Sequence, residues 1–241
     1  MADPPSTTPF EVAASQEDAL LATKLHVPGP QPGLVARPRL LERLEEALAR
    51  GLVVVCAPAG FGKTALLADW ARRSQRTVAW LSLDAGDNDP TRFWRYFVAV
   101  ADRLYPGAGD TALMLLQSSQ APPIEAILTT LLNGLTELPA DAVLVLDDYH
   151  LIKTRTIHEA LAFLIEHLPP QVHLVISTRA DPPLPLSRLR ARGEMAELRA
   201  SDLRFTTEET TAFLQKTVGS RLSAEEVAEL QERTEGWVAG L

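Results

Sequence analysis

The sequence is poor in cysteine and in zinc-ligand patterns. Its one cysteine, Cys56, excludes a disulfide within the chain. Cys56 lies in an apolar run, where a thiol behaves as a small hydrophobic side chain, so we expect it to be buried and inert rather than redox-active. The histidines are not at the spacing of zinc ligands, and we expect structural or surface positions for them. They are His26, His150, His158, His167 and His173.

The chain also lacks membrane signals, export signals and a basic surface. It has no run of about 18 uncharged apolar residues, as a membrane span requires, and residues 1–9 have neither the basic start nor the apolar core of a secretory signal. These absences predict a cytoplasmic protein without membrane contact. The formal net charge is −8 and the arginines are dispersed, which argues against the basic stripe of a nucleic-acid-binding surface. We therefore expect no DNA binding by this segment.

What the chain does have is the composition of an ordinary globular protein, with 46% hydrophobic and 22% charged residues. Its 241 residues suffice for one α/β domain with an appendage or for two modest domains. Prolines and hydroxyl residues predict a flexible leader over 1–22. A domain over 23–205 follows. From there the pattern is helical with Thr206 or Thr207 as N-cap, and because the chain stops inside it, 206–241 is predicted to be the truncated start of a helical domain.

One short segment indicates phosphate binding. It follows the apolar run 52–56 and opens a helical pattern, which is the context of the motif G-x-x-x-x-G-K-[ST], here with Ala57 in place of the first glycine. Glycines let the backbone curl around phosphate oxygens, and N–H groups at a helix N-terminus bind their negative charge. The predicted nucleotide-binding residues are Ala57, Pro58, Ala59, Gly60, Phe61, Gly62, Lys63, Thr64 and Ala65. The alternative is a glycine-rich turn whose lysine points to solvent.

Four side chains have predicted roles in this chemistry. Lys63 would reach the β- and γ-phosphates of ATP from the surface of the loop, and the Thr64 hydroxyl would complete the coordination of Mg²⁺. The apolar run 143–146 ends in two carboxylates, as expected of a buried parallel strand. Asp147 would hold Mg²⁺, and Asp148 would polarise the water that attacks the γ-phosphate. The alternative is that these acids only end the strand and cap the next turn.

The other periodic segments place these motifs in an α/β fold. Strands are predicted at 52–56, 77–83, 142–146, 172–177 and 195–198, and helices at 40–48, 64–74, 90–104, 156–168 and 186–192. The acids Asp84, Asp87 and Asp89 lack the glycine and terminal glutamate of a calcium loop. We expect helix capping instead, with Asp89 as N-cap and Pro90 as the first helical residue.

Many short motifs occur in order along the chain. They include Thr23-Lys24-Leu25, the segment 35–40, Ser82-Leu83-Asp84, the segment 147–150, Ser177-Thr178-Arg179 and the segment 234–241. Together they resemble the ATPase module of the MalT-type regulators, large ATP-binding transcription factors of the LuxR family. A further strand, predicted at 77–83, lies between the strand before the phosphate-binding segment and the strand before Asp147. This order of strands resembles that of the ATPase division that includes AAA+, RecA-like and STAND proteins. This resemblance implies a P-loop NTPase with a parallel five-stranded sheet ordered 5-1-4-3-2 and flanking helices.

The same resemblance implies ligands and partners. Val35, Arg37 and Pro38 would line the adenine pocket, and Arg179 would read the γ-phosphate through its planar guanidinium, unless surface carboxylates fix it. ATP or ADP and Mg²⁺ would bind, hydrolysis would be slow, and the full-length parent would self-associate in its ATP state. DNA would be bound by a C-terminal helix-turn-helix that this chain does not include.

Two other functions stay open. In a catalytic ATPase such as an AAA+ motor, arginines of the helix predicted at 186–192 would act as arginine fingers, although a solvated basic helix is the alternative. These arginines are Arg188, Arg190 and Arg192. The chain is also compatible with a nucleotide-binding module that has no turnover.

Overall fold

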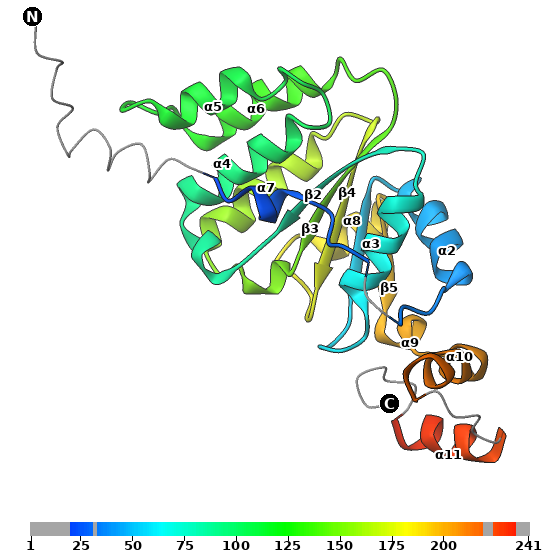
Figure 1. Cartoon of the computed structure of the whole chain (residues 1–241). Helices are drawn as coiled ribbons and strands as arrows, with labels where there is room; N and C mark the ends of the chain where they lie inside the picture. The colour runs from blue at the N-terminus through cyan, green and yellow to red at the C-terminus, as the bar shows by residue number, and fades with distance from the viewer. Residues whose placement is uncertain (1–19, 31–32, 219–223, 235–241) are drawn as a thin grey trace, which may run out of the picture.

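The computed structural model describes residues 20–30, 33–218 and 224–234, which form an α/β fold (Figure 1). The strands are β1 (Leu52–Cys56), β2 (Thr77–Ser82), β3 (Ala142–Asp147), β4 (Val172–Thr178) and β5 (Met195–Arg199). The α-helices are α2 (Pro38–Leu48), α3 (Lys63–Arg73), α4 (Pro90–Ala101), α5 (Asp110–Gln117), α6 (Ile124–Leu135), α7 (Arg155–Glu166), α8 (Leu186–Arg192), α9 (Ala200–Leu203), α10 (Thr207–Val218) and α11 (Ala224–Thr234). The 3₁₀ helices are η1 (Ala22–Leu25), η2 (Ala85–Asn88) and η3 (Tyr149–Leu151). Most of the predicted leader and residues 235–241 lie outside the described residues.

The five strands form one parallel sheet with the order β2-β3-β4-β1-β5. Read from the other edge, this is 5-1-4-3-2, so the predicted order is confirmed. β1 pairs with β4 on one side and β5 on the other, while β3 lies between β4 and the edge strand β2. All strands run in one direction, so their carboxyl ends lie along one side of the sheet, which we call the carboxyl edge. The segment 57–65, Asp147 and Arg179 all lie at this carboxyl edge.

Apolar side chains on both faces of the sheet form two cores. In β1, Leu52 and Val54 belong to one core and Val53 and Val55 to the other, and all four are buried. Residues of α4 to α8 pack in the first core, and those of α2, α3 and α9 in the second. In Figure 1, α2 and α3 accordingly lie on the side of the sheet away from α4 and α7. A strand buried on both faces is a continuous apolar run, as the sequence predicted.

The single thiol lies in the same strand. Cys56 is buried, as predicted, and burial raises the pKa of its thiol. The thiolate is the reactive form of cysteine, and burial disfavours it here.

Several elements differ from the predicted ones in their bounds or were not predicted. The helix predicted over 90–104 ends at Ala101. It ends there because the Asp102 carboxylate accepts hydrogen bonds from the N–H groups of Gly107 and Gly109, at 2.9 Å each, and turns the chain. The strand predicted over 142–146 continues to Asp147, which makes that carboxylate part of β3. The short helix α9 lies where no element was predicted.

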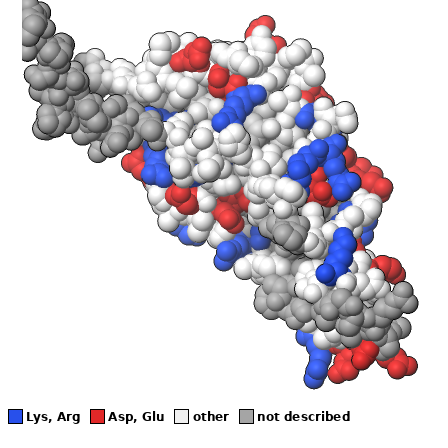
Figure 2. All heavy atoms as spheres, viewed as in Figure 1, with Lys and Arg blue, Asp and Glu red and all other residues white. Residues whose placement is uncertain are grey.

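Charged side chains are mixed over the surface. On the face shown in Figure 2, Lys and Arg side chains are interspersed with Asp and Glu side chains rather than gathered in one basic area. The arginines of α8 are each paired with an acid: Arg188 with Glu166, Arg190 with Glu197 and Arg192 with Glu194. Within the described ranges, no helix is long and apolar enough to cross a bilayer.

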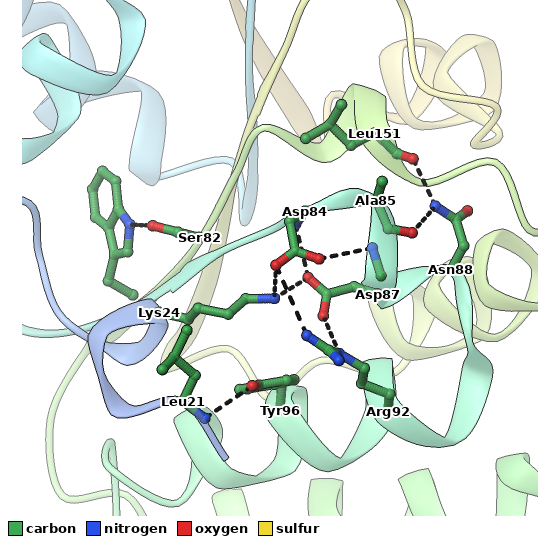
Figure 3. A network of polar contacts seen from close by, with 12 residues as sticks. Leu21, Lys24, Ser82, Asp84, Ala85, Asp87, Asn88, Arg92, Tyr96 and Leu151 are labelled. Atoms are coloured by element: carbon green, nitrogen blue, oxygen red, sulfur yellow. Dashed lines mark hydrogen bonds and ion pairs between the residues drawn. The ribbon is translucent and has the colours of Figure 1, made fainter. Parts of the chain in front are cut away.

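The acidic cluster after β2 caps helices and also binds a lysine. Asp89 caps α4 by accepting a hydrogen bond from the Arg92 N–H at 2.7 Å, as predicted, and Asp84 caps η2. Asp84 and Asp87 also form ion pairs with Lys24 of η1, which the sequence did not predict (Figure 3). The side chains of Lys24 and Asp87 are 7% and 0% exposed. A buried ion pair therefore joins η1 to the segment between β2 and α4.

We expect Lys24→Met to lower the free energy of unfolding by about 3 kcal/mol, because it leaves the buried Asp87 carboxylate with only part of its counter-charge. Arg155→Ala is the control. Its ion pair with Glu159 joins side chains that are 89% and 57% exposed, and such a pair contributes less than about 0.5 kcal/mol. Urea denaturation measures both losses. Equal losses would show that the buried pair does not stabilise the fold.

Candidate functional site

The segment between β1 and α3 forms a tight loop at a helix N-terminus. Gly60 and Gly62 have φ of +80° and +74°, a conformation that a residue without a Cβ adopts at least cost. The helix α3 begins at Lys63, and no side chain of the described ranges caps this end. The first N–H groups of a helix have no partner within it. The loop therefore presents backbone donors and the positive end of a helix dipole at the carboxyl edge of the sheet.

Lys63 lies inside this loop and not at its surface. The residue is 7% exposed, and its Nζ donates to the carbonyl oxygens of Ala57 at 2.7 Å and Pro58 at 2.9 Å. The predicted surface position is wrong, because the loop curls around the side chain. Burial lowers the pKa of Lys63, while the nearby Asp148 carboxylate raises it and Arg179 lowers it further. Lys63 is thus a buried cation, whereas residues 58–60 of the same loop are exposed to solvent.

Asp147, the last residue of β3, lies beside Thr64 and Ser177. It is 3% exposed, and its Oδ1 has no hydrogen-bond partner among the described residues. Burial raises the pKa of Asp147, whereas the hydroxyls of Ser177 and Thr64 lower it. A buried carboxylate oxygen without a partner is unfavourable unless a cation or a donor satisfies it.

Asp147 and Thr64 have the chemistry of a Mg²⁺ site. The described ranges contain no group of three or more His, Cys, Asp and Glu side chains that could hold a metal ion by themselves. Mg²⁺, however, is commonly bound by one or two carboxylates together with waters and the phosphates of a ligand. The Oδ1 of Asp147, which no described residue bonds, lies next to a threonine hydroxyl, and this arrangement fits that mode of binding.

Asp148 begins the turn after β3 in a left-handed conformation. Its φ is +59°, and within the described chain it is the one residue other than glycine with a positive φ. This conformation costs most L-residues roughly 1–2 kcal/mol, and Asp and Asn tolerate it best. The Asp148 side chain is 43% exposed, and its Oδ1 lies 3.7 Å from Nδ1 of His150. Strained residues of this kind cluster at functional sites.

Arg179 and His150 lie at the same edge. Arg179 follows β4 and is exposed, and its positive charge lowers the pKa of both Lys63 and His150. The pKa of His150 is lowered mainly by burial, and its Nδ1 has no hydrogen-bond partner in the described part of the chain. The sequence had placed His150 among the structural or surface histidines. Its position two residues after Asp148 was the signal that could have singled it out.

A pocket lies next to the phosphate loop and shares Gly62 and Ala65 with it. Its walls come from the segment before α2, from α3 and from the region around the start of α10. The lining residues are Gly33, Leu34, Val35, Arg37, Gly62, Ala65, Leu66, Asp69, Phe205 and Phe213. The pocket therefore spans the predicted boundary between 23–205 and 206–241.

Two of the three residues predicted to line an adenine pocket lie in the pocket next to the loop, and the third does not. Val35 and Arg37 line the pocket, whereas Pro38 is exposed at the first position of α2. The aromatic residues Phe205 and Phe213, whose ring centroids are 5.9 Å apart, were not predicted to lie here. No local pattern relates them to the loop, because they follow it by more than a hundred residues.

The guanidinium of Arg37 is engaged by the chain around α9 and α10. It donates to the carbonyl oxygens of Leu203 at 2.9 Å and Arg204 at 2.8 Å, and its Nε donates to Glu209 at 3.2 Å. It also lies 4.6 Å from the centroid of the Phe205 ring. Arg37 therefore supports the aromatic wall of the pocket through its protein contacts.

Comparison with known proteins relates the chain to a family of regulators, although no family model matches it. Over 221 residues, or 92% of the chain, it is 34% identical to the HTH-type transcriptional regulator MalT of Vibrio cholerae. It is 34% identical over 222 residues to MalT of Serratia proteamaculans and 35% identical over 222 residues to MalT of Yersinia pestis. The chain spans 24% of the length of these relatives. The resemblance to MalT-type regulators is therefore confirmed for this portion.

Solved structures agree on the fold. A Signal Transduction ATPase with Numerous Domains (STAND) protein from Pyrococcus horikoshii matches 88% of this chain and 30% of its own, with a TM-score of 0.59 and 19% identity. The Orc1 protein of Aeropyrum pernix, solved in complex with DNA, matches 87% of this chain and 58% of its own, with a TM-score of 0.54 and 18% identity. With the parallel sheet ordered as predicted, these matches show a P-loop NTPase fold.

Proposed function

We propose that this chain, which is homologous to a portion of the MalT-type regulators, is a switch module that binds ADP or ATP with Mg²⁺ and responds to the γ-phosphate. One observation carries the proposal. A buried lysine and a buried carboxylate oxygen that has no partner among the described residues lie close enough to interact electrostatically at the N-terminus of α3, which no described side chain caps. These groups have the charges needed for phosphate and for its metal ion.

Phosphate oxygens would replace the present partners of Lys63. Its ammonium now donates to the neutral carbonyl oxygens of Ala57 and Pro58. A charged acceptor binds an ammonium more strongly than a neutral one, and a buried cation is screened less by solvent than an exposed one. The Lys63 ammonium would therefore donate to oxygens of the β- and γ-phosphates in place of the two loop carbonyl oxygens. The N–H groups at the start of α3 would donate to the same phosphate oxygens.

Thr64 and Asp147 would hold Mg²⁺ beside these phosphates. When bound, Mg²⁺ neutralises part of the charge on the β- and γ-phosphate oxygens. The Oδ1 of Asp147 would gain the partner that the described residues do not give it.

Asp148 and Arg179 would act on the γ-phosphate alone. Asp148, half-exposed at the start of its turn, would orient and polarise the attacking water. The guanidinium of Arg179 would donate to two γ-phosphate oxygens in its fork geometry. We expect slow hydrolysis, so that ATP would persist long enough to act as a signal. A ligand shifts an equilibrium only through contacts that differ between the two states, and the γ-phosphate provides them.

The adenine ring would lie in the pocket next to the loop. Val35, Phe205 and Phe213 offer apolar and aromatic surface, which suits a flat base. Because the walls come from both sides of position 205, the bound base would hold the domain over 23–205 against the helical segment that begins at 206. By analogy with the MalT-type regulators, the parent would alternate between a closed ADP state and an open, self-associating ATP state. DNA recognition would lie outside this chain.

The nucleotide carried by the purified protein tests this proposal. We expect ADP to be released when the protein is denatured and to be identified by ion-exchange chromatography. A site that is empty and releases phosphate steadily from added ATP would instead favour a motor. In that alternative the arginines of α8 would have to leave their acidic partners to act as arginine fingers.

Arg179→Ala is expected to weaken binding of a non-hydrolysable ATP analogue about ten-fold or more and to leave ADP binding nearly unchanged, because a charged hydrogen bond contributes roughly 1.5–3 kcal/mol. Arg192→Ala is the control, since Arg192 is 57% exposed and paired with Glu194. Isothermal titration calorimetry gives both affinities. If Arg179→Ala weakens ADP and the analogue equally, the arginine contacts the α- or β-phosphate or only supports the fold.

A further inference from the structure

A polar cross-link joins the segment before α4 to the turn after β3. Its centre is the side chain of Asn88, the last residue of η2. Asn88 Nδ2 donates to the carbonyl oxygens of Leu151 at 2.9 Å and Ala85 at 3.0 Å (Figure 3). Asn88 Oδ1 accepts from the N–H groups of Lys153 at 2.6 Å and Thr154 at 3.2 Å. One amide side chain thus satisfies backbone groups of two segments that are far apart in the sequence.

The turn held by Asn88 runs from Asp148 to Thr154 and includes His150. It begins with the left-handed conformation of Asp148, and such a conformation persists only where the surrounding structure enforces it. Within the turn, the Leu151 N–H donates to the carbonyl oxygen of Asp148 at 3.0 Å. At its far end, the Thr154 hydroxyl donates to the Asn88 carbonyl oxygen at 2.7 Å. Asn88 therefore fixes the end of the turn that the local bonds leave open.

Two further groups hold this region. Tyr149 is buried under the turn, and its hydroxyl is 2.7 Å from Nδ1 of His158 in α7. On the other side, η2 is anchored by the buried Asp87, which binds Lys24 and Arg92 (Figure 3). The position of Asn88 is thus set by contacts that do not involve the turn.

The geometry points to Asn88 as a positioning residue for hydrolysis. By fixing the turn, it holds the Asp148 carboxylate and the His150 ring beside the place that the γ-phosphate of bound ATP would occupy. The inference rests on the proposed function, because it requires ATP at the phosphate loop. None of the hydrogen bonds found for Asn88 in the described ranges reaches the loop, so ADP binding does not depend on it.

Asn88→Ala tests this assignment. Phosphate release from saturating ATP should fall about 10- to 100-fold, since a misplacement of about 1 Å at a reacting centre has an effect of that order. ADP affinity measured by calorimetry should stay within about two-fold, because no phosphate contact is changed. Hydrogen exchange of the peptide 148–154, followed by mass spectrometry, should become faster, because the Lys153 and Thr154 amides lose their acceptor.

Asp89→Ala is the matched control. It removes the N-cap of α4 next to Asn88, but its side chain bonds the Arg92 N–H and not the turn. We expect it to lower thermal stability while leaving phosphate release and exchange of 148–154 at the parent values. Should Asn88→Ala not fold, Asn88→Asp keeps the acceptor for both amides and removes the donor to Leu151. It should show a smaller loss of phosphate release.

The outcomes separate the inference from the proposed function. Phosphate release at the parent rate by a folded Asn88 variant would overturn the inference and leave nucleotide binding standing, and so would an equal loss with Asp89→Ala. A parent chain that binds ADP but releases no phosphate would overturn both hydrolysis and this role of Asn88. A parent chain that binds no nucleotide would overturn the proposed function itself.

Discussion

Lys63→Ala is expected to abolish nucleotide binding under ordinary assay conditions while leaving the fold intact. The ammonium would give at least two charged hydrogen bonds to phosphate oxygens, each worth roughly 1.5–3 kcal/mol, so the affinity should fall by about 10²-fold or more. The fold should persist because the hydrogen bonds of Lys63 found within the described part of the chain go to the loop carbonyl oxygens of Ala57 and Pro58, and Pro58 is exposed to solvent. Calorimetry with ADP and ATP measures the affinity, and circular dichroism measures the fold.

Lys153→Ala is the control for a general loss of positive charge. Lys153 is exposed, and its charge affects the pKa of His150 in the same edge of the sheet. We expect its nucleotide affinity to stay close to that of the parent, since screening by salt weakens the effect of an exposed charge. Unchanged affinity in Lys63→Ala would refute the phosphate-loop assignment.

Asp148→Asn should suppress hydrolysis without preventing binding. A general base contributes roughly 10²- to 10⁴-fold to a rate, and an amide cannot accept the proton of the attacking water. Asparagine also tolerates the left-handed φ of +59° at this position, so the turn should keep its shape. Single-turnover phosphate release and ATP affinity, measured on the same preparation, separate the two effects.

Asp147→Asn is the companion variant. It removes the charge of the buried carboxylate beside Thr64 and should weaken Mg²⁺-dependent ATP binding. If Asp148→Asn hydrolyses ATP at the parent rate, the role assigned to that carboxylate is wrong. If Asp147→Asn binds ATP equally well with and without Mg²⁺, and as tightly as the parent, the metal site lies elsewhere.

The sequence predicts which residues lie at the carboxyl ends of the strands, because these residues directly follow apolar runs. The segment 57–65 comes after one such run, and Asp147 ends another, so their place at the ends of strands depends only on local pattern. The strand order was predicted through a resemblance, and the structure confirms it. The geometry at each residue did not follow from the pattern. Lys63 is buried although lysine is normally exposed, because the loop curls around it.

Pairings between distant segments could not be predicted. Arg37 and Glu209 are 172 positions apart, and Lys24 and Asp87 are 63 positions apart, yet both pairs are in contact. Hydrophobic periodicity reports which face of an element is buried, but not which charged residue a side chain will meet. Arg37 was assigned to the adenine pocket through the family resemblance; it does line the pocket next to the loop, but the resemblance gave no sign that its guanidinium donates to the chain around α9 and α10.

Titration of the parent chain with ADP and with a non-hydrolysable ATP analogue, each with and without Mg²⁺, tests the central claim most directly. We predict that both nucleotides bind at one site per chain, that Mg²⁺ strengthens binding of the analogue, and that Lys63→Ala removes the binding heat of both. The absence of binding by either nucleotide to the folded parent chain would contradict the account, as would binding that Lys63→Ala leaves unchanged.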